Sequence, residues 1–392
     1  MAPVRTDAGE VGARAGTAVC ALLLAILVSA GVSANAQMPD AAGAVAVDAA
    51  PASSEEPWQT LGLLRIRDLT LFGINRLDML PAHAVPATPG TFAIEVSLGY
   101  QNTWSVSGNV RDYLAERGIE RGEIGDAEIA EIFALPGESY LVDGELGVAD
   151  LTLHYRIARH LGVYTTIPYY HFGTDFLDST IEGFHNGIGI SNAGRNYVPK
   201  DRFLALVHLD AGSLVLREPP DDDFGDPVFG VRYSLTDGTG PANIVVEAAY
   251  KWSWSDRARL VSTGSDDFGL EVSFQRKFRR NALYLSLAGV YLGGLEPLIG
   301  NNRWIPTVVA GWETRLSRRF NFIIQSYFSE SVVQETSLDE LSADKFQVTA
   351  GLQWIYRGAV LRFGITENVE NFDNTPDIGI TLSAAKVVFG RR

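Results

Sequence analysis

The chain has 392 residues and a formal net charge of −15, because 47 aspartates and glutamates stand against 32 lysines and arginines. This acidic balance argues against a protein that binds nucleic acid through its phosphates. The length suits one large domain or two ordinary ones. After the N-terminal region no stretch is continuously apolar enough for a membrane helix, whereas glycine and tyrosine are plentiful. This composition favours alternating strands over helices.

The N-terminus has the pattern of an export signal. Two arginines precede an apolar run over Ala18–Val28, and small residues ending at Ala36 follow, which is the order of a secretory signal peptide. The run is too short to remain as a membrane helix. Cys20 lies inside the run and not just after it, so a lipoprotein anchor is not indicated. We predict that residues 1–36 are cleaved, which leaves a mature chain without a thiol.

Two segments precede the first strand of the mature chain. Residues 37–57 form a loose, disordered linker rich in alanine, proline and acidic residues. Residues 58–91 follow as a periplasmic segment or as a plug for the barrel. In an extended chain the apolar and the basic side chains of this segment lie on opposite faces. The plug candidates are Leu64, Arg65, Ile66 and Arg67.

Two interpretations of this segment stay open. It has no hairpin partner, so its apolar side chains need cover, and packing alone explains the pattern. Alternatively the segment gates the lumen, where its two arginines would lie among inward carboxylates. The carboxylates expected there are Glu95, Glu247 and Glu271.

Apolar and polar residues alternate from Phe92 onwards, which puts the apolar side chains of each strand on one face. A soluble β-sandwich shows the same alternation, so one strand decides nothing. The alternating segments are about ten residues long, as tilted membrane strands are, whereas soluble strands usually have about five or six. The predicted strands are 92–104, 140–157, 161–170, 226–235, 243–252, 267–278, 282–292, 304–316, 320–329, 346–356, 359–368 and 377–389.

Very short, arginine-rich turns alternate with long links between these strands. Short periplasmic turns and long extracellular loops are typical of an outer-membrane barrel, and an even strand count puts both termini on the short-turn side. We therefore predict an all-β fold, a transmembrane antiparallel up-and-down β-barrel of about 12 strands over residues 92–389, in the outer membrane of a Gram-negative bacterium. The short turns are Ala158–His160, Arg279–Asn281, Ser317–Arg319 and Tyr356–Gly358.

The inner faces of these strands carry charges of both signs. In strand 140–157 the apolar alternation slips between Val148 and Ala149, so we expect a β-bulge there. Two interpretations of the inward charges have equal weight: opposed walls orient polar solutes in a channel, or the charges pair across the interior and partly close it. The pore-lining candidates are Glu95, Glu145, His154, Arg156, Arg232, Glu247, Lys251, Glu271, Lys277, Glu313, Arg315, Arg362 and Asp377.

The long link after the third strand contains apolar residues at helical spacing. A helix there would have one apolar side, which must pack against the lumen mouth, the lipid surface or another loop. The residues of this loop helix are Leu177, Ile181, Phe184 and Ile188.

Four short motifs are distinctive. They are Phe176–Asp178, Ile181–Gly187, Gly194–Asn196 and, near the end, Asp373–Ile380. In these motifs the chain resembles a family of Gram-negative outer-membrane barrels that is catalogued as a domain of unknown function. The resemblance covers roughly residues 60–389. It implies the fold and the location and supplies no biochemical role.

The six histidines give no convincing active site. None is followed two residues later by a serine, the spacing that puts both on one strand face in outer-membrane lipases. His208 and Asp210 come nearest to the histidine–acid pair of rim proteases, but one isolated pair favours a hydrogen-bonded loop histidine. Metal-ligand spacing, a phosphate loop and a dinucleotide fingerprint are all missing from the sequence. We predict no catalytic residues, no metal site and no cofactor.

The polar inner faces lead to the hypothesis of a passive or gated channel for small polar solutes. The alternative is a transporter of hydrophobic or lipid-like molecules, because Pro168 and Pro306 lie near strand ends where a missing N–H could open a lateral gap. A surface structural protein is a third class and depends on the large loops.

The expected partners follow from the location. They are outer-membrane lipids, lipopolysaccharide, periplasmic chaperones and the barrel-assembly machinery, and no nucleic acid. Phe389, the aromatic residue of the last strand, is the expected assembly signal, although Gly390–Arg392 follow it. The acidic loops are suited to hold divalent cations.

Overall fold

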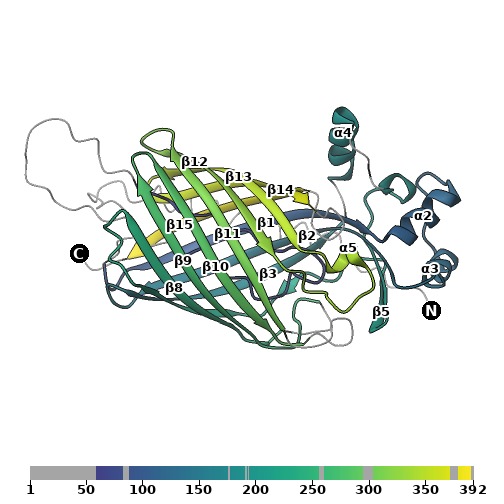
Figure 1. Ribbon diagram of the computed structural model, residues 1–392, viewed down its shortest axis with the longest axis horizontal. Helices are drawn as coiled ribbons and strands as arrows, with labels where there is room; N and C mark the ends of the chain where they lie inside the picture. Colours follow the sequence, from purple (N-terminus) through teal and green to yellow (C-terminus); the bar gives the residue numbers. More distant parts are fainter. Residues whose placement is uncertain are drawn as a thin grey trace, which may run out of the picture.

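A closed β-barrel forms most of the chain (Figure 1). The computed structural model describes residues 59–82, 88–174, 177–189, 192, 194–255, 260–294, 303–370 and 378–389. Strand β1 pairs antiparallel with β15 as well as with β2, which closes the sheet on itself. The barrel strands are β1 (Phe92–Val106), β2 (Ser139–Arg156), β3 (Leu161–Gly173), β7 (Val228–Ser234), β8 (Ala242–Lys251), β9 (Asp267–Phe278), β10 (Asn281–Leu292), β11 (Arg303–Arg315), β12 (Phe320–Ser329), β13 (Lys345–Tyr356), β14 (Ala359–Glu370) and β15 (Ile378–Phe389).

The predicted fold class is confirmed. The ring contains twelve strands, and each is antiparallel to both of its neighbours. Every predicted strand range coincides with one of them to within about three residues, and the predicted short turns connect β2 to β3, β9 to β10, β11 to β12 and β13 to β14. Residues 235–241 make a fifth connection at the same end, between β7 and β8.

The faces of the barrel are inverted relative to a soluble protein. On β9 the apolar side chains point outwards, so that Leu270 is 57% exposed, whereas the adjacent Glu271 points into the lumen and is 4% exposed. Exposed apolar side chains recur on the outer face of most other strands. An apolar outer band around a polar interior is what lipid requires of a spanning barrel. The molecule is therefore a transmembrane β-barrel of the outer-membrane type.

The bulge predicted between Val148 and Ala149 is wrong. Strand β2 keeps one continuous register with β1 and with β3 through this point. Leu146 and Val148 point into the lumen, where they are buried in a hydrophobic cluster. The backbone of β2 is regular. The apolar residues change from the outer to the inner face along β2 because an apolar core occupies the lumen near the end at which Leu146 lies.

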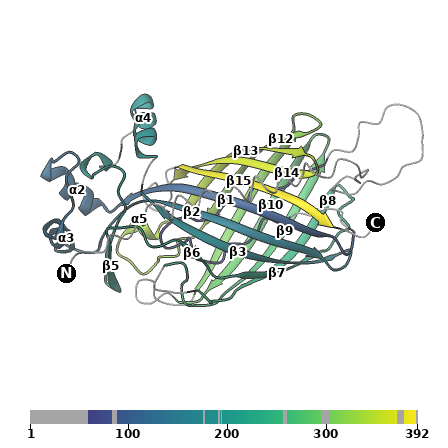
Figure 2. The ribbon, with the colours of Figure 1, turned by 180° about the vertical axis from the view of Figure 1, so that it is seen from behind.

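The helices gather beyond one end of the barrel, and β15 ends at the opposite end (Figures 1 and 2). We call these the loop end and the short-turn end. At the loop end β1 and β2 continue into a small lobe with its own core, which includes Trp104, Leu114, Ile132 and Leu206. The elements outside the ring are α2 (Gly108–Arg117), α3 (Asp126–Phe133), α4 (Asp178–Ile188), η1 (Arg195–Tyr197), β4 (Leu204–Leu209), β5 (Gly212–Leu216), β6 (Asp223–Phe224) and α5 (Asp339–Ser342).

None of the helices within the described ranges is long and apolar enough to cross a bilayer.

Candidate functional site: the occupied lumen

Residues 59–82, which we call the luminal segment, run through the interior of the barrel and back. At the short-turn end Asn321 donates a hydrogen bond to the carbonyl of Gln59 (3.2 Å). At the loop end the N–H of Leu77 donates to Asp267, the first residue of β9 (2.9 Å). The segment then returns, so that Ala82 packs against the inner face of β8. One hairpin-like stretch of chain therefore occupies the full length of the lumen.

Four side chains on adjacent strands hold the backbone of Leu61–Leu64. Glu313 of β11 accepts two successive N–H groups (2.9 and 3.2 Å). Gln325 of β12 accepts one N–H (2.8 Å) and donates to the carbonyl of the same residue (3.0 Å). Gln353 of β13 and Arg362 of β14 each donate to a carbonyl, at 2.7 and 3.2 Å. These bonds satisfy backbone groups that would otherwise be buried without partners.

Glycines in the wall make room for two leucines of the luminal segment. A Cβ atom at Gly364 would lie 2.7 Å from Leu64 Cδ1, and one at Gly351 would lie 2.6 Å from the same atom. A Cβ atom at Gly311 would clash in the same way with Leu63. Glycine weakens a strand interior and is typical of close approach by another chain. The wall is thus shaped for this segment.

The two arginines of the luminal segment pair with Asp150 of β2, across the lumen from β12. Arg65 Nε lies 3.1 Å and Arg67 Nη1 lies 2.9 Å from its carboxylate. Arg67 also donates to the hydroxyl of Tyr170 (3.2 Å). Asp150 is absent from the predicted residues, although it has the same parity as His154, so the signal was present in the sequence.

The three carboxylates among which these arginines were expected have ion-pair or hydrogen-bond partners of their own. Glu95 pairs with Arg362 (3.2 Å) and lies 3.5 Å from His154. Glu247 pairs with Arg232 and accepts a hydrogen bond from Tyr164. Glu271 accepts a hydrogen bond from the hydroxyl of Ser273. The ion-pair partner of both arginines, Asp150, was not predicted, because sequence parity gives the facing of a side chain and no distances.

Glu145 does not line the lumen, contrary to the prediction. Its parity on the regular β2 strand is opposite to that of Asp150, so it points outwards. There it accepts hydrogen bonds from the hydroxyl of Tyr100 and from the N–H of Leu177 (2.6 Å). The predicted bulge caused this error, because it assigned the residues of β2 on the loop-end side of Val148 to the wrong face.

The remaining charged candidates lie at different levels of the lumen. Lys251 is buried near the loop end, where it pairs with Asp267 (3.0 Å) and donates to the carbonyl of Asn75 (3.0 Å). Glu313, Arg232 and Arg362 take part in the contacts described above. Arg156, Lys277 and Arg315 have inward parity towards the short-turn end, and Asp377 lies outside the described residues.

An apolar core fills the half of the lumen at the loop end. Leu69, Phe72 and Ile74 of the luminal segment pack with the inward residues of β2 and β3. Val261 and Leu341 from the long loops belong to the same core. The loops therefore cover the luminal segment at the loop end.

A cavity of about 60 Å³ remains between the luminal segment and the wall formed by β9–β12. Its apolar lining includes Val290, Ile305 and Val309. Carboxylates line it as well, among them Asp78 and Glu271. This cavity and the luminal segment together are the candidate functional site.

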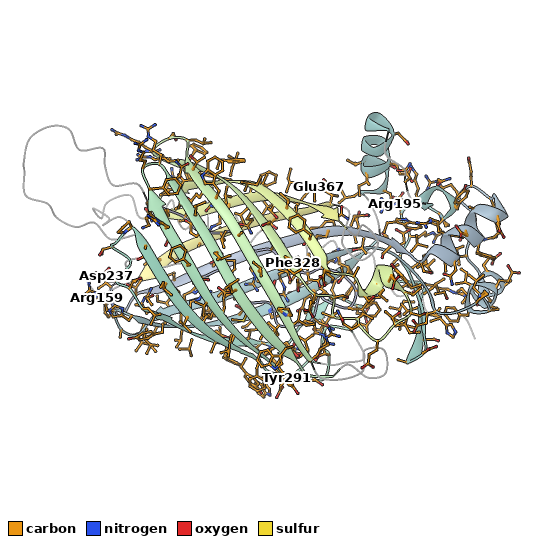
Figure 3. All side chains as sticks on the ribbon, viewed as in Figure 1. Arg159, Arg195, Asp237, Tyr291, Phe328 and Glu367 are labelled. Atoms are coloured by element: carbon orange, nitrogen blue, oxygen red, sulfur yellow. The ribbon has the colours of Figure 1, made fainter. Side chains whose placement is uncertain are left out.

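The distinctive motif of the long third link forms an anchor at the loop end. Arg195, labelled in Figure 3, donates to Asn102 of β1 (2.7 Å) and lies 3.8 Å from Asp178. Glu182 pairs with Arg121 and with Lys200, each at 2.6 Å. The predicted loop helix is present as α4, with Ile181 buried, and the side chains of Phe184 and Ile188 lie outside the described set.

The histidine–acid pair considered from the sequence does not form. His208 Nδ1 contacts the hydroxyl of Ser213 (2.7 Å), and its ring stacks on Phe133. The N–H of Asp210 donates to Glu138 instead (2.7 Å). Among the described residues, no three or more histidines, cysteines or acidic side chains are grouped so that they could hold a metal ion.

The anchor motif lies in the part of the chain that a family model matches, residues 121–387, which is more than half of the sequence. The model is described as a protein of unknown function, DUF3187. The chain belongs to this family. The luminal segment precedes the matched range, so it is not part of the DUF3187 match. No curated protein sequence matches the chain.

Several solved barrels are similar in shape at low sequence identity. An outer-membrane channel of the COG4313 group from Pseudomonas putida F1 has 10% identity and a TM-score of 0.47, over 79% of this chain and 100% of that one. The NanC porin has 6% identity and a TM-score of 0.39, over 76% of this chain and 100% of the porin. The toluene transporter TodX of P. putida has 10% identity and a TM-score of 0.38, over 78% of this chain and 92% of the transporter.

Proposed function

We propose that this barrel is a gated channel for small polar solutes and that residues 59–82 are its gate. One observation supports this above all: a single segment is hydrogen-bonded to β11–β14 on one side of the lumen and ion-paired to Asp150 on the other. In this state the segment closes the path. Permeation then requires the segment to move within the barrel or to leave it.

The wall behind the gate suits polar solutes. Its inward side chains are mostly hydroxyls, amides and paired charges, so a solute that replaces the segment meets hydrogen-bonding groups. Near the short-turn end these groups already bind peptide N–H and C=O groups, and the same groups can bind a solute. The buried polar side chains of the wall include Ser97, Gln101, Thr152, Gln275, Gln325, Thr349, Gln353, Thr366 and Ser383.

Conductance of single channels in planar bilayers tests the proposal. Gly364→Val and Gly311→Val, which we call the socket variants, fill the space that these glycines leave for Leu64 and Leu63. Each variant displaces its leucine, so we expect more frequent and larger openings than in the wild type. Gly289→Val is the matched control, because Gly289 points outwards and its Cβ atom would meet only the ring of Trp304, at 3.4 Å. If both socket variants conduct no more than the Gly289 variant, the segment is not a gate.

A transporter of hydrophobic molecules is the second candidate. The observation in its favour is the apolar wall of the cavity, formed by Val290, Ile305 and Val309, together with the apolar core above it. Such a transporter would bind its solute in the barrel without conducting ions, so the bilayer recordings separate the two candidates.

A further inference from the structure

Three consecutive hairpins form a continuous rim at the short-turn end of the barrel. The β9–β10 turn contacts the end of β11, because the N–H of Arg315 donates to the carbonyl of Arg280 (2.9 Å). The β11–β12 turn contacts the end of β13 in the same way, through the N–H of Ile355 and the carbonyl of Arg319 (3.0 Å). The turns of β9–β10, β11–β12 and β13–β14 therefore lie side by side. We call them the arginine rim, residues 278–281, 315–320 and 356–359.

The arginine rim is strongly basic. Its arginines are Arg279, Arg280, Arg315, Arg318, Arg319 and Arg357, and its three ranges contain no aspartate or glutamate. Arg318, Arg319 and Arg357 are exposed, and no acidic side chain of the described ranges forms an ion pair with them. At the β2–β3 turn, by contrast, Arg159 pairs with Asp237 of the β7–β8 connection (3.2 Å; Figure 3). The side of the barrel from β9 to β14 therefore presents positive charge without acids of its own.

Two arginines of the rim occupy positions that do not favour arginine. Arg279 has a φ of 53° and Arg357 a φ of 50°, both in the left-handed region of the backbone. This conformation is unfavourable for residues with a bulky side chain, and glycine or asparagine usually occupies it in two-residue hairpin turns. The geometry of the turns therefore does not explain these arginines, and a contact outside the barrel would.

Large apolar side chains lie beside the rim on the lipid-facing surface. Phe320 and Leu316 are exposed, and the ring of Phe320 stacks on that of Trp354 (6.3 Å between centroids). On the outer face of β11, Trp312 donates a hydrogen bond to the side chain of Asn281 (3.1 Å). Such aromatic residues are typical of the interface between the hydrocarbon of a membrane and its headgroups. The arginines follow these residues at the ends of the strands, so they lie at the level of the headgroups.

We propose that the arginine rim binds an anionic phospholipid of the leaflet at the short-turn end. Its phosphate would accept hydrogen bonds from the guanidinium groups of Arg318 and Arg319, which suit phosphate oxygens in charge and geometry. Its acyl chains would lie against Phe320 and Leu316. A zwitterionic headgroup is a poorer match, because it brings a positive group to the same arginines. This proposal does not depend on whether the luminal segment is a gate.

Native mass spectrometry of the full mature chain in detergent tests the proposal. The probes are dioleoylphosphatidylglycerol, dioleoylphosphatidylcholine, which has the same acyl chains and a zwitterionic headgroup, and glycerol 3-phosphate, which has a phosphate and no acyl chain. Each arginine near a membrane surface strengthens the binding of anionic lipid by about fivefold. We therefore expect phosphatidylglycerol to bind at least about tenfold more tightly than the other two. Equal binding of the two lipids overturns the proposal, and equal binding of glycerol 3-phosphate would show a site for free phosphate instead.

Variants locate the site. Replacing Arg318 and Arg319 together by glutamine should lower the preference for phosphatidylglycerol by about fivefold or more, whereas replacing both by lysine keeps the charge and should retain most of it. The matched control replaces Arg202 and Arg217 by glutamine, because these are exposed arginines at the loop end and the net charge changes equally. This control should bind as the wild type does.

Two results with the variants would contradict the assignment. An unchanged preference in the folded glutamine variant of Arg318 and Arg319 would place the lipid elsewhere. An equal loss in the control would mean that net charge, and not the arginine rim, attracts the lipid. The three probes on the wild type decide whether the chain prefers anionic lipid even if a variant fails to fold.

Discussion

The two halves of the luminal segment are held in the barrel by different interactions. Near the short-turn end, Leu61–Leu64 is held by side chains of the wall that bind its backbone. Near the loop end, Leu69, Phe72 and Ile74 are part of an apolar core that includes residues of the long loops. Hydrogen bonds from the wall hold the first half, whereas burial in a shared apolar core holds the second.

This difference indicates which half moves. A hydrogen bond contributes about 0.5–1.5 kcal/mol net, because water can replace either partner. Apolar burial contributes about 25 cal/mol for each Å² removed from water, and water offers no substitute. We therefore expect the short-turn half to detach first, and the loop-end half, which we call the cap, to move only after it when the channel opens.

Leu69→Ala should destabilise the cap. Leu69 is 1% exposed within the apolar core, and replacing a buried leucine by alanine usually costs about 2–5 kcal/mol. The expected result is a clear fall in the temperature at which the detergent-folded barrel loses its heat-dependent gel mobility. Leu270→Ala on the lipid face, where the side chain is 57% exposed, is the control and should shift that temperature far less. Equal shifts of this temperature in Leu69→Ala and Leu270→Ala would show that Leu69 contributes no more to stability than a lipid-facing leucine does.

Gln353→Ala should loosen the short-turn half with a smaller loss of stability than Leu69→Ala. It removes the hydrogen bond to the carbonyl of Gly62, at 2.7 Å, and leaves that buried carbonyl without this donor, so we expect a cost of about 1–3 kcal/mol. Because that bond holds the part that detaches first, the open probability in planar bilayers should rise more than it does in Leu69→Ala. A smaller rise than in Leu69→Ala would reverse the proposed order of release.

Acid should weaken the loops that cover the cap. Burial alone would raise the pKa of Glu138, but hydrogen bonds from Thr336, Asp210 and Ser337 outweigh it and hold the pKa below the ordinary value of 4.5. A depressed pKa in the folded state gives stability that is present above pH 4.5 and is lost as the pH falls through the lower, folded value.

Hydrogen exchange of residues 330–344 measures this effect. Protection should be constant from neutral pH down to about 4.5 and fall below it. Glu138→Gln should show weaker protection at neutral pH and no fall of this kind. Wild-type protection that stays constant below this range would show that the carboxylate does not hold the loop.

The sequence alone determined the barrel. Alternation with period two, segments of about ten residues and the contrast between short and long connections are local features, and a strand in lipid has few other ways to satisfy them. The same alternation placed Glu95, Glu247, Glu271 and Lys251 on the inner face correctly. It also marked Leu64–Arg67 as a segment that needs cover.

What fills the barrel follows from contacts between residues far apart in the sequence. The inward apolar residues of β2 looked like a slipped strand, because their cover comes from Leu69 and Phe72, far away in the sequence. The same distance hid the pairing of Arg65 and Arg67 with Asp150 and the purpose of Gly311 and Gly364. The face of a strand on which a side chain lies follows from its position one or two residues away from its neighbours. The residues that this side chain contacts depend on the path of the chain through the lumen, and the alternation of a single strand does not predict that path.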